Sequence, residues 1–396
     1  MINLRYVRYL AAGLLCLTGF GGLGGCADTG YLLQSASGHL AMLRAAKPVT
    51  QWLDDAQTPP DLKARLALAQ RIRRFAVTDL GLPDNASYNQ YADLKRRAVV
   101  WNVVAAPEFS LTLKTWCFPV TGCIGYRGYF DEAKARAFAA ELKAELKADG
   151  LEVSVYGVPA YSTLGWMNWA GGDPLLNTFI NYPEGELARL IFHELAHQVV
   201  YAKDDTMFNE SFATAVERLG GARWLARQGS PAGKAEFDAQ VNQRAQFRAL
   251  TLATRRTLAD IYERKTPGAT GEFTQAAAKS RAMKDFREQY AALKESWVAA
   301  AIAASRGSST STASQSSAAA ARFSGYDAWV ANANNASFGA QAAYDELVPD
   351  FEALFDRINI QAAKDASDPW PRFYAAVKRL AELPEKERRQ ALKSGS

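Results

Sequence analysis

Histidine and cysteine are both scarce in this sequence: the 396 residues include three histidines and four cysteines. With so few cysteines, no second pair could join Cys117 and Cys123 in a tetrahedral zinc site. The net charge of +5 is modest and spread along the chain, so a nucleic-acid-binding patch is not expected. A hydrophobic content of 48% with 11% aromatic residues indicates a globular protein.

The N-terminal segment has the layout of an export signal. Arg5 and Arg8 precede an apolar run over residues 10–23, which is short and broken by glycines for a membrane span. The run ends in Leu-Gly-Gly-Cys, which resembles a bacterial lipobox in which Cys26 becomes the lipidated first residue. The residue after Cys26 is Ala27. By resemblance to lipoprotein sorting in Gram-negative bacteria, Asp at this position would indicate retention in the inner membrane, so Ala27 suggests the outer membrane. We therefore expect a lipid-anchored protein of the bacterial cell envelope, on the outer membrane facing the periplasm; a plain cleaved signal or an uncleaved anchor is the alternative.

Two cysteines other than Cys26 remain after the signal. Cys117 and Cys123 flank a turn in "WCFPVTGCIGY", marked by Pro119 and Gly122. An oxidising periplasm favours a short-loop disulfide between them. Two buried free thiols are the alternative.

The chain divides by composition into five parts. We expect a signal peptide over 1–25, a lipidated stem with one helix over 26–60, and a catalytic region over 61–302. A flexible Ser/Ala-rich loop is expected over 303–322, because this stretch is poor in large apolar side chains. The pattern predicts a helical region over 323–396 that packs on the catalytic region.

Periodicity places a small sheet directly before a run of helices. Helical patterns cover 61–80 and 131–149, with Asp131 and Gly150 as cap signals. "LEVSVYGV" alternates, and "AYSTLGW" and "NTFINY" are short β-rich runs, which predicts two or three strands over 151–182. From 184 onward the chain is almost wholly helical. The predicted fold class is α+β and predominantly helical, with the sheet preceding a helix that carries "HELAH" and a second helix that carries glutamates.

"LIFHELAHQVVY" contains two of the three histidines. On a helix, His193 and His197 project from the same face and can chelate one Zn²⁺, while Glu194 can reach a metal-bound water molecule. An interior helix with two satisfied core histidines is the alternative. Against it, a buried unpaired glutamate among apolar residues would cost several kcal/mol, which a neighbouring metal ion removes. His39 stands alone and is expected at the surface.

A catalytic zinc ion needs a third protein ligand, and no further histidine is nearby. "NESFATAVE" supplies Glu210 and Glu217, seven residues apart on one face of a helix. From the residues alone, either carboxylate can complete the site.

"HELAHQ…NESFATAVE" resembles the zinc aminopeptidases of the aminopeptidase N type, which are gluzincins. In that family the glutamate of an Asn-Glu-Gly-Phe-Ala run binds zinc, which implies Glu210. The family's usual spacing from the second histidine is longer and would fit Glu217 instead. We favour Glu210 because a loop shortens more easily than the register around a ligand changes; Glu217 then orients a ligand histidine.

The chain as a whole resembles a narrower group, the zinc aminopeptidase lipoproteins of Gram-negative bacteria. Matching pieces include "YLLQSASGHLAMLR", "CFPVTGCIGYRGYFDE", "DPLLNTFINY" and "NNASFGAQAAYDELVPDFEALF". The resemblance implies one Zn²⁺ per chain, a peptide substrate, membrane attachment through Cys26 and no nucleic acid; it names no protein partner.

The implied reaction is the attack of water on a peptide carbonyl, with Glu194 as general base. A further donor should stabilise the oxyanion, and in related enzymes it is a tyrosine or histidine. Tyr344, Tyr182 and Tyr201 are the candidates, with Tyr344 preferred.

The sequence gives less evidence for specificity toward the free N-terminus of a peptide than for hydrolysis itself. In the family, a Gly-x-Met-Glu-Asn strand binds the substrate amine through its glutamate. This chain has Gly165 and Trp166 at the corresponding place, in a strand that could pair with a peptide, but it lacks the acid. Asp173 or Glu184 could bind the amine instead. A zinc endopeptidase, or an outer-membrane lipoprotein with a binding or assembly role, stays an alternative.

Overall fold

The computed structural model describes residues 25–118, 122–145, 150–165, 168–263, 271–304 and 312–394. The expected signal peptide therefore lies outside the described residues, apart from Gly25, and so does Trp166. Cys26 lies in the first described helix, although its side chain is not among those described.

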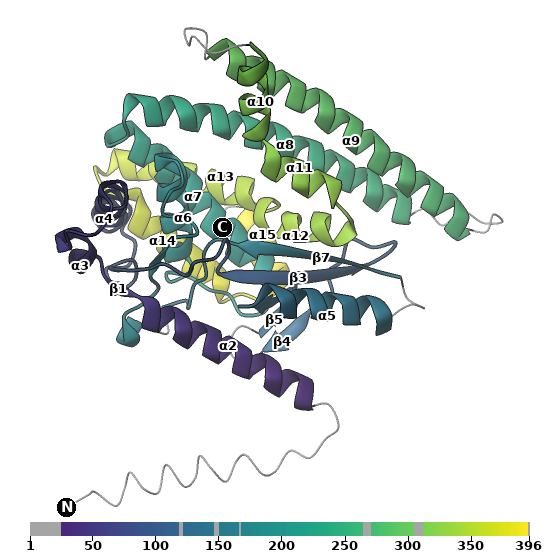
Figure 1. Cartoon of the computed structure of the whole chain (residues 1–396), viewed down its shortest axis with the longest axis horizontal. Helices are drawn as coiled ribbons and strands as arrows, with labels where there is room; N and C mark the ends of the chain where they lie inside the picture. Colours follow the sequence, from purple (N-terminus) through teal and green to yellow (C-terminus); the bar gives the residue numbers. More distant parts are fainter. Residues whose placement is uncertain are drawn as a thin grey trace, which may run out of the picture.

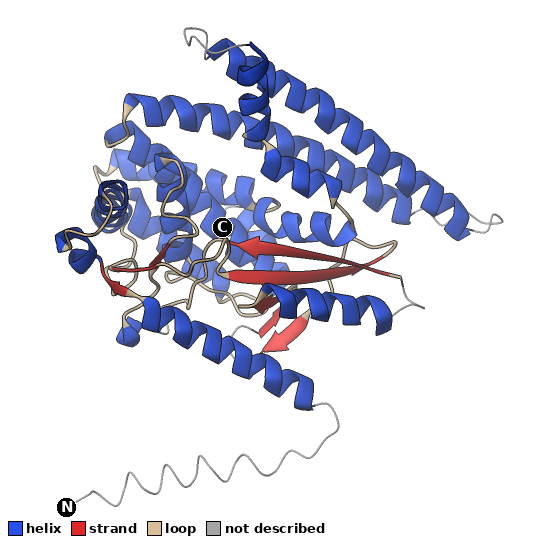
Figure 2. Cartoon of the chain, in the orientation of Figure 1, coloured by secondary structure: helices blue, strands red, loops and turns tan. Residues whose placement is uncertain are grey.

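Helices dominate the part of the chain that the structure describes (Figure 2). The predicted α+β, predominantly helical class is confirmed. The helices are α2 (Gly25–Ala45), α3 (Val49–Asp54), α4 (Pro60–Leu80), α5 (Glu132–Glu145), α6 (Glu184–Ala196), α7 (Thr206–Arg227), α8 (Pro231–Glu263), α9 (Gly271–Ala304), α10 (Thr312–Ala321), α11 (Ser324–Ala331), α12 (Asn335–Asp345), α13 (Val348–Lys364), α14 (Pro369–Ala381) and α15 (Glu385–Ser394).

The described strands form three small sheets. The largest has the antiparallel order β6–β3–β7, with β7 at one edge, and β3 pairs with β7 over its whole length. The strands are β1 (Lys47–Pro48), β2 (Gln90–Ala92), β3 (Val100–Pro107), β4 (Trp116–Phe118), β5 (Gly122–Ile124), β6 (Arg127–Tyr129), β7 (Leu151–Val158) and β8 (Leu175–Leu176). Because β3 is buried on both faces, it lacks the alternation that identifies β7.

The strand prediction for residues 151–182 is only partly correct. Two strands lie in this range, as predicted: the alternating run forms β7, and Leu175–Leu176 form β8. However, "AYSTLGW" and "NTFINY" form no strand among their described residues. Side chains satisfy the backbone there in place of a neighbouring strand: the Asp173 carboxylate accepts from the Thr163 N–H. Farther along, the Asn177 Oδ1 accepts from the Leu94 N–H. A segment can therefore have the composition of a β-strand and still form a loop, because side chains rather than a neighbouring strand bond its backbone.

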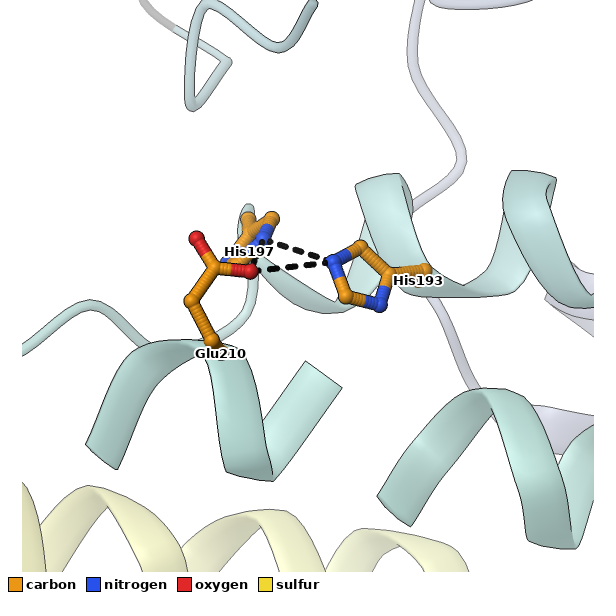
Figure 3. A group of neighbouring side chains, drawn as sticks. All are labelled: His193, His197 and Glu210. Atoms are coloured by element: carbon orange, nitrogen blue, oxygen red, sulfur yellow. Dashed lines mark hydrogen bonds and ion pairs between the residues drawn. The ribbon is translucent and has the colours of Figure 1, made fainter. Parts of the chain in front are cut away.

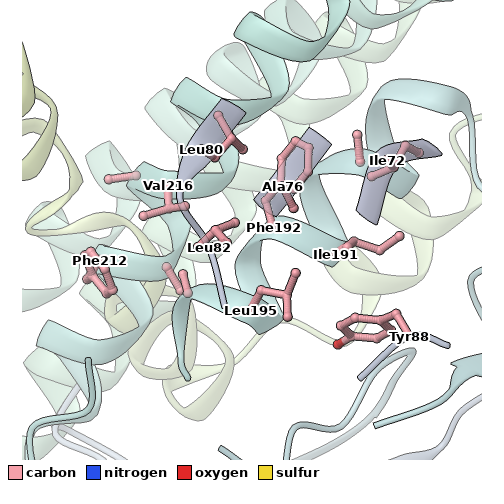
Figure 4. Close-up of a cluster of buried hydrophobic side chains, with 14 of the residues drawn as sticks. Ile72, Ala76, Leu80, Leu82, Tyr88, Ile191, Phe192, Leu195, Phe212 and Val216 are labelled. Atoms are coloured by element: carbon pink, nitrogen blue, oxygen red, sulfur yellow. The ribbon is translucent and has the colours of Figure 1, made fainter. Parts of the chain in front are cut away.

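The main hydrophobic core lies against one face of helix α6. Figure 4 shows side chains of α4, α6 and α7 gathered around it, among them Ile72, Ile191, Phe192, Phe212 and Val216, all of them buried. The opposite side of α6 carries the polar residues of the site. The apolar contacts therefore fix the orientation of the helix and, with it, the direction of its histidines.

Helices α8 and α9 run side by side along one side of the molecule (Figure 1). The stretch 303–322, predicted as a flexible loop, contains α10, while residues 305–311 lie outside the described residues. Alanine has the highest helix propensity, and α10 packs on α9 with Ala319 buried, which explains the helix. Among the described helices, none combines the length and the apolar character that a membrane crossing requires.

The C-terminal helices pack on the site-bearing helices, as α13 contacts α7 and α15 reaches the loop before α7. Arg388 of α15 is buried and donates from Nη1 to the Asp205 Oδ2 at 2.6 Å. Asp205 is also the N-cap of α7, accepting from the Phe208 N–H. One buried ion pair thus joins the end of the chain to the start of α7.

We expect Arg388→Met to lower the free energy of unfolding by about 3 kcal/mol or more, because the Asp205 carboxylate would stay buried without its cation. Urea unfolding of the full chain measures this. Arg389→Met is the matched control, since Arg389 is 34% exposed and lies 3.9 Å from Asp205. Equal losses in the two variants would show that the buried pair adds nothing beyond helix packing.

Candidate metal centre

Helix α6 begins after Pro183 as its N-cap, with Glu184 and Glu186 in its first turn, where acidic side chains favour the helix dipole. It ends at Ala196, so His197 is the C-cap residue and still has helical backbone angles. Both histidines therefore keep the one-turn spacing that the sequence predicts.

Three potential ligand atoms converge at this end of the helix (Figure 3). The Nε2 atoms of His193 and His197 lie 3.2 Å apart. The Oε2 of Glu210 lies 3.3 Å from the first and 3.6 Å from the second. Zinc bonds of about 2.0–2.2 Å in a tetrahedron set ligand atoms roughly 3.3–3.5 Å apart. The spacing of the three atoms therefore fits a single zinc ion.

Glu217 lies on the far side of His193. Its Oε2 is 3.0 Å from the Nδ1 of His193, and its Oε1 forms an ion pair with Arg189. A proton on Nδ1 that donates to Glu217 leaves the lone pair of Nε2 directed at the cluster. Burial raises the pKa of the Glu217 carboxyl, but Arg189 and His193 outweigh it and lower this pKa to about 2. Glu217 is thus ionised and fixes the orientation of His193.

The two histidines differ in their support. Whereas His193 has Glu217 behind it, the Nδ1 of His197 is buried without a hydrogen-bond partner among the described residues. Burial lowers the pKa of His193, but hydrogen bonds with Glu210 and Glu217 raise it well above its ordinary value. The centre is therefore a place where buried carboxylates favour a bound positive charge.

A tight loop explains how Glu210 reaches the histidines from only thirteen residues beyond His197. Asn209 is buried, and its amide bonds Ala202 twice: Nδ2 donates to the Ala202 carbonyl and Oδ1 accepts from the Ala202 N–H, both at 2.7 Å. The residue before the glutamate thus holds the loop closed and sets the register of α7. In the pair Asn209-Glu210, the asparagine fixes the loop and the glutamate supplies a potential metal ligand.

Glu194 lines the cavity beside this cluster. Burial raises the pKa of its carboxyl, the two histidines oppose the shift, and Glu210 and Asp173 add to it. A carboxyl that is easier to protonate than usual suits the acceptance of a proton.

The cluster opens into a cavity of about 780 Å³, lined mostly by apolar surface. Tyr182 and Tyr201 line it as expected for candidate donors, while the side chain of Tyr344 lies outside the described part of the chain. Burial, with Glu210 adding to it, raises the pKa of Tyr201 to about 12. Tyr126 also lines the cavity, and burial and Glu210 hold its pKa well above the ordinary value.

Sequence reasoning missed Tyr126. It lies two residues beyond β5, and the only signal for it is its position directly after the "CFPVTGC" hairpin. Cys117 and Cys123 form the predicted disulfide, which closes this hairpin. The Cys123 N–H also donates to the Oδ1 of Asp204, at 2.6 Å, so the hairpin is attached to the loop between α6 and α7.

The predicted substrate strand at Gly165 is not a strand. Gly165 has φ +78°, a left-handed conformation that favours glycine, in the loop after β7. A Cβ there would approach Asn168 and the Gln198 side chain, which is one residue past His197. The segment that lines the cavity runs instead from Val158, the last residue of β7, through residues 159–162 and 164.

Neither alternative acid for a substrate amine is among the described residues that line the cavity. Asp173 is 1% exposed and accepts from the Thr163 N–H and the Gln198 amide. Glu184 accepts from the indole N–H of Trp224. His39 is half-buried beside Tyr161 rather than at the surface, far from the cluster in sequence and absent from its ligand atoms.

A His–His–Glu cluster with the spacing of metal ligands, a neighbouring carboxyl and an adjoining cavity thus lie together in one candidate site. The family described as "Putative aminopeptidase" matches residues 30–392, so the chain belongs to this family, which supports a peptidase-like function. Searches of the curated proteins and of the solved structures found no match.

Proposed function

We propose that the protein is a zinc-dependent peptidase, acting as an aminopeptidase. The observation that carries this proposal is the convergence of His193, His197 and Glu210 at separations suited to tetrahedral zinc, with Glu194 on the same cavity. The family supports peptide hydrolysis, and the cluster supports a metal-assisted mechanism for it.

His193, His197 and Glu210 would hold the ion, and Glu217 would keep His193 in the tautomer that binds it. When bound, zinc supplies the Lewis acid that polarises the scissile carbonyl and acidifies a water molecule. Glu194 accepts the proton of the attacking water and delivers it to the leaving amine. The cavity wall is mostly apolar, and low polarity beside the cluster strengthens these charge interactions.

The oxyanion needs a hydrogen-bond donor, and Tyr126 and Tyr201 are candidates among the tyrosines that line the cavity. The charge of the nearby Glu210 contributes to raising the pKa of each. Their raised pKa values keep both protonated and able to donate. We expect one of Tyr126→Phe and Tyr201→Phe to reduce kcat by about 100-fold with KM nearly unchanged. Steady-state kinetics on a peptide substrate measures this; two unaffected variants would exclude both phenols from this role.

The function is tested by profiling the products that the zinc-loaded protein releases from a mixed peptide pool. Loss of single N-terminal residues indicates an aminopeptidase, and internal cuts indicate an endopeptidase. Hydrolysis should stop when a chelator removes zinc and return when zinc is restored. If the zinc-loaded protein cleaves no peptide, the alternative of a binding or assembly lipoprotein is favoured.

We further propose that Cys26 carries the lipid that anchors the protein in the cell envelope, at the outer membrane facing the periplasm. The lipobox-like sequence supports this, and the disulfide is compatible with an oxidising compartment. Mass spectrometry of the mature N-terminus tests it: an unmodified Cys26, or a chain that begins elsewhere, would contradict the assignment.

A further inference from the structure

Helix α2, the first described helix, forms part of the cavity wall. Tyr31 and Ser35 of α2 line the same cavity as the metal-ligand cluster, and so do residues of α8. Figure 1 shows α2 and α8 on opposite sides of the molecule, with α6 and α7 between them. The cavity therefore reaches from the ligand-bearing helices to α2, which is one of its outer walls.

Side chains of α2 occupy the outer edge of β6. Strand β6 pairs with β3 on one side and is an edge strand of the described sheet. On its other side, Gln34 bonds the backbone twice: its Nε2 donates to the Gly128 carbonyl and its Oε1 accepts from the Phe130 N–H, both at 3.2 Å. The Tyr31 hydroxyl accepts from the Gly128 N–H at 3.3 Å. Because Gly128 and Phe130 also line the cavity, α2 takes the position where an extended peptide could otherwise pair with this edge.

Close packing holds α2 in this position. A Cβ atom at Gly38 would overlap the Phe130 side chain, so glycine is needed for the helix to approach so closely. The guanidinium carbon of Arg127 lies 4.2 Å from the centre of the Tyr31 ring. Farther along α2, Met42 is buried in the main core. The helix is thus a packed part of the wall and not a loosely attached stem.

The carboxylates in the described part of the cavity wall are those of four glutamates: Glu186, Glu194, Glu210 and Glu217. Two of them form ion pairs with arginines, and the other two are the proposed base and the proposed metal ligand. None of the four is therefore reserved for the amine of a substrate. Selection of a free N-terminus needs another physical basis.

We propose that α2 ends the substrate cavity on the side of the N-terminal residue, so that the enzyme selects a free N-terminus by excluding any chain that continues past it. A peptide that continued in that direction would have to displace the Tyr31 ring and the hydrogen bonds between α2 and β6. This inference rests on the proposed aminopeptidase function and names the element that would restrict it to the end of a peptide.

The test measures binding, so that it does not depend on turnover. One short peptide is joined to the same inert folded carrier protein in two ways. As an N-terminal tail it has a free N-terminus, and as a C-terminal tail it is preceded by the carrier. Zinc-loaded full-length Glu194→Gln protein is titrated calorimetrically with each fusion. We expect the N-terminal tail to bind about tenfold or more tightly, because the carrier of the other fusion would collide with α2.

A third fusion separates exclusion of the chain from recognition of the amine. Its N-terminal tail lacks the terminal amino group, which removes the positive charge without adding bulk. If α2 excludes the chain, this tail should bind within about threefold of the tail that has the amine. Binding as weak as that of the C-terminal tail would show that the amine itself is recognised, and the inference would be wrong.

Two glycines of α2 provide a matched pair of variants. Gly38→Ala should displace α2 from Phe130 and strengthen binding of the C-terminal tail, so that the preference falls to about threefold or less. Gly30→Ala adds the same methyl group to the same helix but meets no atom within 4 Å, and it should keep the full preference. Binding of the N-terminal tail should stay unchanged in both variants, which shows that the cavity is intact.

Tyr31→Ala is a second variant, independent of the packing at Gly38. It removes the ring that lines the cavity and should likewise admit the C-terminal tail. Tyr31→Phe keeps the ring, loses only the hydroxyl that accepts from Gly128, and should retain most of the preference.

The outcomes separate this inference from the proposed function. If the two tails bind equally, if neither binds, or if the C-terminal tail binds more tightly, the inference is wrong, even if the protein hydrolyses peptides. A preference that survives both Gly38→Ala and Tyr31→Ala assigns the exclusion to another wall and also overturns it. A preference that these substitutions abolish and Gly30→Ala retains supports the inference. It does so even if the wild-type protein hydrolyses no peptide, which would overturn only the proposed function.

Discussion

Glu194→Gln is expected to lose peptide hydrolysis by about 1000-fold while still binding one zinc ion per chain. The amide cannot accept the proton of the attacking water, and positioned general bases contribute rate factors of about this size. Zinc should stay because the three convergent ligand atoms belong to other residues. Peptide hydrolysis rates, together with the metal content of the purified protein, measure the two effects.

The control for this variant is Glu184→Gln, which removes the same charge from the same helix. Glu184 contacts Trp224 and Ser230 and is not among the described residues that line the cavity. It should leave both rate and zinc content unchanged. Hydrolysis that persists in Glu194→Gln would exclude Glu194 as the base and with it the proposed mechanism.

The second large effect distinguishes the two glutamates of α7. Glu210→Ala should abolish tight zinc binding, because it removes one of the three ligand atoms. Glu217→Ala should weaken zinc binding by about 10–100-fold, since it removes the group that orients His193 but leaves the ligand set intact. Competition against a chelator of known affinity measures both. Glu217→Gln can still accept from the Nδ1 of His193, and so it should weaken binding less than Glu217→Ala.

The reverse order, with zinc lost from Glu217→Ala and kept by Glu210→Ala, would contradict this assignment. It would mean that the longer spacing typical of gluzincins, and not the local sequence around Glu210, identifies the ligand. Circular dichroism of both variants is the necessary check, because Glu217 also holds the buried Arg189.

The sequence was a good guide wherever a local pattern carries the signal. The one-turn spacing of His193 and His197 and the alternation of β7 both depend on fixed backbone periods, so the structure reproduces them. The Cys117–Cys123 disulfide also follows from a short turn. Such features need only a few neighbouring residues to specify them.

Features that depend on distant residues were not predictable. The position of Tyr126 on the cavity depends on how the β4–β5 hairpin attaches to Asp204, 81 residues further along. Similarly, the irregular path of residues 160–165 depends on the Asp173 carboxylate, which substitutes for a strand partner.

The ion pair between Arg388 and Asp205 gives this protein an order of assembly. Residues 193–210 leave the ribosome well before residue 388. Until α15 arrives, the N-cap of α7 lacks the buried cation that pairs with it, and the loop joining the two site-bearing helices is incompletely held. The loop that leads from His197 to Glu210 is therefore held at its α7 end only once α15 has packed against it.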